Sequence, residues 1–180
     1  MPEVASTVNS GLSDVMLNNV ITGQIPRRIV VAMVLNKAFT GDIKENPFNF
    51  QHFNINYLAA NIDGVQYPTL AYQPDFTNDL YIREYLSIFE AYNQITTDSV
   101  INLHILHYED GNVMFGFNFS QDSTDDYYKV GYTNAKKEGS LGLHLKFSTA
   151  LENSINVLIY CEYDNLIEID VERQVKTDFQ

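Results

Sequence analysis

The chain contains 180 residues, of which 45% are hydrophobic and 13% aromatic, and its 23 acidic residues outnumber its 11 basic ones. A chain of this length can bury one sizeable core, and the composition excludes a disordered or collagen-like protein. The net charge of -12 argues against direct binding to nucleic acid, which needs clustered Lys and Arg.

The sequence shows neither a membrane-span pattern nor a leader pattern. No window approaches the roughly 18 consecutive apolar residues of a membrane span, and the first residues lack the basic and apolar regions of a secretory signal. The single cysteine, Cys161, has no partner for an internal disulfide. The sequence therefore indicates a reducing compartment over an oxidising one. We therefore expect residues 1–180 to form a single domain that neither spans a membrane nor is secreted.

Three strands are expected in the first third of the chain. Residues 1–22 are expected to hold an N-terminal strand, over residues 4–8, and a lead-in. Residues 28–35 are apolar after Arg28 and rich in β-branched side chains, which predicts a buried strand. Residues 53–59 show a two-residue alternation that predicts a strand before a turn at Asp63-Gly64. One face of that strand is expected to carry Phe53, Ile55, Tyr57 and Ala59.

A loop and then a helix are expected next. Residues 65–77 contain Pro68 and Pro74 and are predicted to be a loop. Asn78 is expected to cap a helix over residues 78–92, inserted in a long connection. One helix face is then formed by Tyr81, Tyr85, Ile88 and Tyr92.

The second half of the chain alternates with the two-residue period of strands. Three phenylalanines share a face in residues 113–119, leucines alternate in residues 141–147, and residues 155–161 follow the same pattern. A turn is expected at Asp164-Asn165, and residues 167–171 are predicted to be a half-solvated strand. We therefore expect an all-β fold with one or two short helices in connections, an antiparallel eight-stranded jelly-roll sandwich or barrel.

The search for a metal site centres on His104 and His107, the only close histidine pair. Three residues apart, they would share a helix face but point apart on a strand, and a third ligand would be needed nearby. His52 and His144 are isolated, and His144 is expected to face solvent. We expect no metal site.

The other side chains that could be reactive are expected to be buried in the core or exposed to solvent without a catalytic role. Cys161 lies on an apolar strand face and is predicted to be a small buried side chain. The acidic cluster over residues 122–126 lacks the pattern of a calcium loop, and Glu168 and Asp170 are expected on the wet side of a strand. The glycosylation acceptor at Asn118 lies at the end of a predicted strand. No phosphate-binding or nucleophile-elbow motif occurs, so we expect no catalytic or cofactor-binding residue, no cofactor and no enzyme activity.

A family resemblance rests on three stretches, with shorter matches between them. The stretches are Gly23-Gln-Ile-Pro-Arg-Arg-Ile-Val-Val31, Asn46-Pro-Phe-Asn-Phe-Gln-His-Phe53 running on to Asp63-Gly64, and Tyr160-Cys-Glu-Tyr-Asp-Asn-Leu-Ile-Glu-Ile-Asp170. Together they resemble the C-terminal part of the major capsid proteins of Maverick/Polinton elements and adintovirus-like viruses. Residues 73–76, 81–89 and 115–119 follow in the family's order, so the resemblance runs from about Gly23 to Phe179.

The resemblance implies a jelly roll of the double jelly-roll capsid lineage without enzymatic activity. In that family, three chains with two jelly rolls each form a pseudo-hexagonal capsomer of an icosahedral shell. Self-association into a trimeric or pseudo-hexameric capsomer, contact with other capsid proteins, and a place in the virion after assembly inside the host cell are therefore implied.

The resemblance covers only the second of the family's two jelly rolls. An excised domain, a truncated element copy and a protein that assembles from single barrels all remain open. The aromatic residues within 67–92, and Tyr127, Tyr128 and Tyr132, either form contact surfaces or cover the barrel ends.

Two other functional classes remain open beside a capsid subunit. The first is a jelly-roll binding module, lectin-like or derived by a host from an integrated viral element, because a fold does not fix a function. The second is a cupin-type enzyme, which the histidine spacing disfavours.

Overall fold

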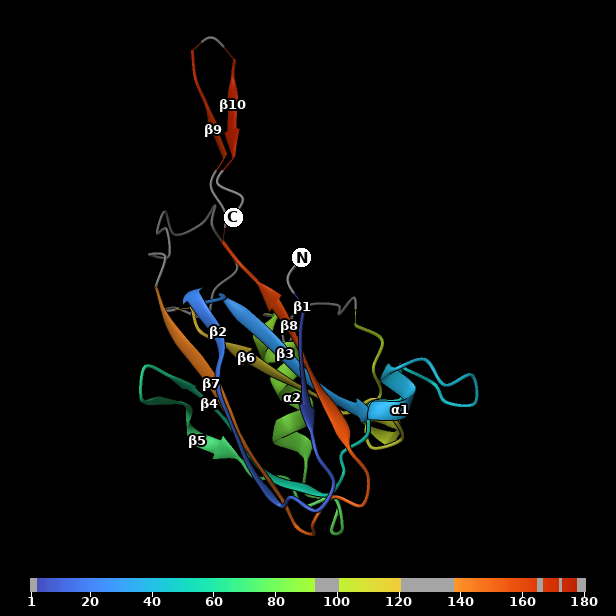
Figure 1. Ribbon diagram of the computed structural model, residues 1–180. Helices are drawn as coiled ribbons and strands as arrows, with labels where there is room; N and C mark the ends of the chain where they lie inside the picture. The colour runs from blue at the N-terminus through green and yellow to red at the C-terminus, as the bar shows by residue number, and fades with distance from the viewer. Residues whose placement is uncertain (1–2, 93–100, 121–137, 165–166, 172, 178–180) are drawn as a thin grey trace.

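Two antiparallel four-stranded sheets pack face to face in the computed structural model, which describes residues 3–92, 101–120, 138–164, 167–171 and 173–177 (Figure 1). The first sheet contains β1 (Glu3–Val8), β8 (Ile155–Glu162), β3 (Arg28–Leu35) and β6 (Met114–Asn118). The second contains β2 (Asp14–Gln24), β7 (Glu138–Phe147), β4 (Ile55–Ile62) and β5 (Val65–Tyr72). Helices α1 (Asn36–Phe39) and α2 (Ile82–Ala91) and the 3-10 turn η1 (Ile105–His107) lie in connections.

The strand order confirms the expected jelly roll. The sheets run β1-β8-β3-β6 and β2-β7-β4-β5, so β4 pairs with β5, β3 with β6, β2 with β7 and β1 with β8. These strands therefore form one long antiparallel hairpin wrapped on itself. Its tip is the predicted turn at Asp63 and Gly64, which both have positive φ. This is the double Greek key of a jelly roll.

The core lies between the two sheets and follows the predicted alternation. Along β7 and β8, the inward side chains are buried at every second position, and the side chains between them are mostly less buried. Phe115, Phe117 and Phe119 enter the same core from β6 and its end. The predicted strand over residues 28–35 is β3, which lies between two neighbours in the first sheet.

The predicted inward face of β4 is correct at Ile55 and wrong at Tyr57. The pairing with β7 shifts between Ile55 and Tyr57, so that Leu58 and Ala60 enter the core. Such a bulge moves the later side chains to the opposite face. Tyr57 is consequently half-buried on the outer side of the sheet.

Two strands occupy segments that we expected to be a lead-in and a loop. The lead-in contains β2, whose pairing with β7 shifts between Leu17 and Ile21, with Asn19 at positive φ. The prediction of a loop over residues 65–77 is wrong for β5. Pro68 fits there because β5 is the edge strand of its sheet, where a missing N–H need not break a ladder bond.

Helix α2 is shorter than predicted and is not capped by Asn78. It begins at Ile82 after Tyr81, and no side-chain hydrogen bond caps it. The side chain of Asn78 instead donates to Asp75 Oδ2 at 2.7 Å in a preceding turn. The predicted tyrosine face is nevertheless directed inward, since Tyr81 is buried and Tyr85 is half-buried. Among the described helices, none is long and apolar enough to cross a membrane.

The segment after β8 forms a separate two-stranded ribbon. Strand β9 (Ile167–Ile169) pairs with β10 (Val175–Thr177), and the ribbon extends away from the sandwich (Figure 1). The prediction of a half-solvated strand is therefore wrong about burial, because Ile167, Ile169 and Val171 are all exposed. The expected turn at Asp164-Asn165 lies partly outside the described residues, which do not include Asn165.

Candidate binding groove

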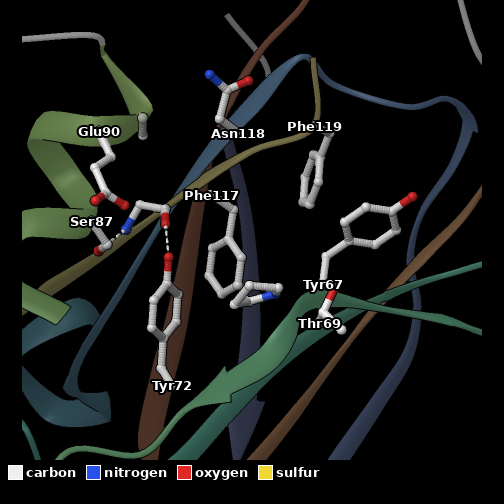
Figure 2. A pocket seen from close by; sticks show the side chains of 11 residues that line it. Tyr67, Thr69, Tyr72, Ser87, Glu90, Phe117, Asn118 and Phe119 are labelled. Atoms are coloured by element: carbon white, nitrogen blue, oxygen red, sulfur yellow. Dashed lines mark hydrogen bonds between the residues drawn. The ribbon is translucent and has the colours of Figure 1, made fainter. Parts of the chain in front are cut away.

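Helix α2 and β5 supply side chains that satisfy the free edge of β6. Among the described strands, β6 pairs only with β3. On its other side, Gly116 donates its N–H to Ser87 Oγ at 2.9 Å, and its carbonyl oxygen accepts a bond from the Tyr72 hydroxyl at 2.8 Å (Figure 2). An unpaired strand edge is a template for wrong pairing, and these two side chains occupy it at Gly116.

The close approach of α2 requires glycine at position 116. A Cβ placed there would lie 2.5 Å from the Ser87 carbonyl oxygen and 2.8 Å from Ala91 Cβ. Both distances are shorter than van der Waals contact, and one of the atoms belongs to the helix backbone. The small residue therefore determines how closely the helix packs on the strand.

A groove of about 480 Å³ opens beside this junction, between β5, the second half of α2 and the end of β6. Tyr67 and Phe119 form an aromatic wall, with ring centroids 5.7 Å apart and nearly perpendicular planes. Glu90 lies on the helix side, and Asn118 lies on the strand above Phe117 (Figure 2). An aromatic wall with a carboxylate on the opposite side of the groove can bind a ligand with both apolar and polar parts.

The hydroxyl groups of Ser87 and Tyr72 beside the groove form structural hydrogen bonds. Ser87 donates to the Glu84 carbonyl oxygen at 2.6 Å in addition to accepting from Gly116. Burial raises the pKa of Tyr72 to about 12, so its hydroxyl stays protonated and donates at neutral pH. These bonds run to backbone groups, unlike the bond to a histidine or carboxylate that activates a hydroxyl nucleophile.

Glu84 is a buried carboxylate that connects α2 to the end of β5. Its side chain accepts the backbone N–H of Gln73 at 3.0 Å, and the residue is only 4% exposed. Burial raises the pKa of this carboxyl above its ordinary value. Arg83, the preceding residue, donates to the carbonyl oxygens of Leu70 and Ala71.

The first three histidines of the chain lie apart from the groove and hold local structure. His104 precedes η1 and His107 is its last residue, with ring centroids 6.2 Å apart, and His104 Nδ1 accepts the N–H of Leu106. His52 stacks on Phe76 with ring centroids 4.3 Å apart. Within the described ranges, no three His, Cys, Asp or Glu side chains gather as a potential metal site.

His144 belongs to a polar cluster on the outer face of the second sheet. Its Nε2 lies 2.7 Å from Asp14 Oδ1, and Lys146 Nζ lies 3.2 Å from the other Asp14 oxygen. Hydrogen bonds from His144 and Lys146 lower the pKa of Asp14. Tyr57 packs edge-on against His144, so the bulge in β4 completes a cluster that strand alternation alone does not predict.

The remaining candidates lie in structural or exposed positions. Cys161 is buried in the core, and burial raises its pKa to about 11, which keeps it a thiol at neutral pH. Asn118 Oδ1 accepts bonds from the backbone and the hydroxyl of Ser120. Asp170 is exposed in the segment between β9 and β10. Six further candidates lie outside the described ranges: Asp122, Asp125, Asp126, Tyr127, Tyr128 and Tyr132.

Comparison with known proteins points to a distant relative but shows no family. No family model matches the chain. The chain is similar to the uncharacterized protein F54H12.2 of Caenorhabditis elegans. The two are 25% identical over an alignment 186 residues long, which covers 98% of this chain and 43% of the worm protein. The chain thus spans less than half the length of that relative.

Proposed function

We propose that this chain is a non-enzymatic structural subunit of an icosahedral, virus-like shell, in which its jelly roll contributes to the capsomers. The observation that carries the proposal is the strand order of both sheets, which is that of a jelly roll. The sequence resemblance described above adds the capsid lineage to this fold. In this proposal the protein acts in the virion, after assembly inside the host cell.

The length of the worm relative is compatible with a second domain. Since the alignment covers 43% of that protein, more than half of it lies outside the region similar to this chain. We propose that a second jelly roll accompanies the first in the functional capsomer, either in the same polypeptide or as a separate chain.

The proposed partners are further copies of the chain and other capsid proteins. Three pairs of jelly rolls would form a trimeric, pseudo-hexameric capsomer. The excess of acidic residues supports assembly without direct contact to nucleic acid, because binding to phosphates needs clustered basic side chains.

Solution mass and electron microscopy test the capsid proposal. Light scattering coupled to size exclusion across a concentration series, with and without the second jelly roll co-expressed, should give trimers, hexamers or shells. Negative-stain images should then show rings or closed particles. A chain that stays at 20.6 kDa in both preparations contradicts the proposal.

The groove favours a second candidate function, a jelly-roll binding module. Its volume of about 480 Å³ and its aromatic wall suit part of a small ligand. In this case the purified chain would be a monomer, and a Tyr67→Ala variant would lose binding to a ligand found by screening while keeping its fold. The cupin-type alternative predicts stoichiometric metal in the purified protein, which elemental analysis measures.

A further inference from the structure

The ribbon β9–β10 has an apolar surface that the described part of the chain leaves open to solvent. Ile167, Ile169, Val171 and Val175 are each at least 60% exposed. Ile169 is paired with Val175 across the ribbon, so these two residues are neighbours. An isolated two-stranded ribbon is marginally stable in water, and a partner that covers this surface would stabilise it.

A second exposed apolar surface, here named the end patch, lies around the start of α2. It consists of Leu70, Leu80, Ile82 and Leu86, whose exposed fractions are 67%, 66%, 62% and 37%. Ile82 and Leu86 are one helical turn apart and share a face. Arg83 beside them donates to the carbonyl oxygen of Leu70, which brings β5 next to the helix.

The ribbon and the end patch lie at opposite ends of the sandwich. Leu80 exchanges two backbone hydrogen bonds with Asp75, and Asp75 lines a small cavity together with Ser148, which follows β7. Strand β8 starts at that same end, after the β7–β8 loop, and runs the length of the sandwich toward the ribbon (Figure 1). The two apolar surfaces are therefore separated by the length of the sandwich.

We propose that the apolar side of the ribbon binds the end patch of a second copy of this chain, in a head-to-tail contact. The inference deepens the capsid function and rests on it, because a shell needs repeated contacts between copies. A contact between two different surfaces leaves one of each free at the ends of a dimer, so further copies add, and a ring closes where the rotation between copies permits it.

Charge supports a second copy as the occupant. With a net charge of -12, two copies repel each other over most of their surfaces. Residues 167–177 are nearly balanced, with three acidic and two basic residues, and residues 80–86 contain one acidic and one basic residue. Contact between these two regions therefore joins apolar surfaces of low net charge and keeps the acidic surfaces apart.

The small area of the contact favours a head-to-tail arrangement, in which an inner copy makes two contacts. Four aliphatic side chains cover much less than the roughly 800 Å² per partner of a standard stable interface. A single contact would therefore be weak, and repetition of the contact at every junction of an assembly would strengthen it. Pairing ribbon to ribbon would cover the ribbon but leave the end patch exposed, whereas head-to-tail pairing covers both.

Complementary variants test the contact in the 180-residue chain. A ribbon variant carries Ile169→Ser and Val175→Ser, and an end-patch variant carries Ile82→Ser and Leu86→Ser. The matched control carries Ile43→Ser and Phe48→Ser, at positions 98% and 74% exposed outside both surfaces. Circular dichroism and urea unfolding verify that each variant folds before its mass is measured against concentration by light scattering.

The expected result is a specific pattern of masses. The parent and the control form oligomers, each double variant alone remains at 20.6 kDa, and an equimolar mixture of the two variants forms a dimer and nothing larger. The mixture dimerises because one intact ribbon meets one intact end patch.

Other results overturn the inference, and they separate it from the capsid proposal. An end-patch variant that dimerises alone indicates ribbon-to-ribbon pairing. If both variants form the same oligomers as the parent, or if the parent associates only when a second jelly roll is supplied, the contact is wrong while the capsid function stands. If the parent stays monomeric even with a second jelly roll supplied, both proposals fail.

Discussion

At the scale of single residues, the hydroxyl of Tyr72 stabilises the edge of β6. We expect Tyr72→Phe to lower the free energy of unfolding by about 1–2 kcal/mol, because the buried carbonyl oxygen of Gly116 loses its partner. Tyr57→Phe is the matched control: its hydroxyl bonds to Gln66 on the exposed face, and its removal should change stability by less than about 0.5 kcal/mol. Urea unfolding measures both. Equal losses in the two variants would contradict this assignment.

Glu84 should make stability depend on pH. Because burial raises its pKa above 4.5 in the folded chain, the folded state holds the proton more tightly than the unfolded state. The contribution of Glu84 to stability is therefore present below about pH 4.5 and is lost as the pH rises through the folded pKa. We expect Glu84→Gln, which keeps an acceptor for the Gln73 N–H, to gain stability relative to the parent between about pH 4 and about pH 7.

Unfolding by urea at several pH values measures this difference. Each unit by which the pKa is raised corresponds to about 1.4 kcal/mol at neutral pH. The control is Glu90→Gln, an exposed residue on the same helix, whose stability curve should follow that of the parent. Parallel curves for Glu84→Gln and the parent would exclude Glu84 as the source.

At the scale of elements, the contact between α2 and β6 depends on Gly116. We expect Gly116→Ala to destabilise the fold by about 1–3 kcal/mol, since the added methyl group overlaps the helix backbone and forces α2 outward. Asn118→Ala, two residues along the same strand, is the control and should cost less than about 1 kcal/mol. Thermal unfolding followed by circular dichroism compares them. An unchanged melting temperature for Gly116→Ala would show that the helix adjusts without cost.

The sequence predicts best the elements whose two faces differ in polarity. Strands β7 and β8 alternate over long runs, and β3 is apolar after Arg28, so the sequence alone predicts the inward faces of β7 and β8 and the burial of β3. Strand β2 lacks this regularity because its bulge near Asn19 interrupts the alternation. Strand β5 lacks it because it lies at a sheet edge with a proline. The ribbon has the pattern of a half-buried strand, yet its apolar side chains are exposed within the described part of the chain.

The groove could not be predicted from spacing along the chain. Its walls come from three segments that the jelly-roll topology brings together, represented by Tyr67, Glu90 and Phe119. Each of these residues alone suggests only a packed or solvated side chain. A signal was present at Gly116, a glycine between phenylalanines in a strand, which is a common sign of a close backbone approach.

At the scale of the whole molecule, salt should promote association. The acidic surfaces of two copies repel at low ionic strength, and at about 0.3 M salt the Debye length falls below roughly 8 Å. We expect the oligomer fraction at a fixed concentration to rise between about 0.05 M and about 0.3 M sodium chloride. Sedimentation velocity measures this. A decrease with salt would indicate that ion pairs, and not apolar contacts, hold the copies together.

The nesting of the strand pairs has a consequence for how the chain reaches its native state. Pairing of β4 with β5 needs only a tight turn, but pairing of β1 with β8 joins residues far apart, as in the bond between Thr7 and Asn156, 149 positions away. Such non-local pairing makes folding slow, on the order of milliseconds to seconds. During synthesis, the first sheet cannot be completed until Glu162 has left the ribosome. Until then, the nascent chain exposes unpaired strands to other nascent chains that are being made on the same mRNA.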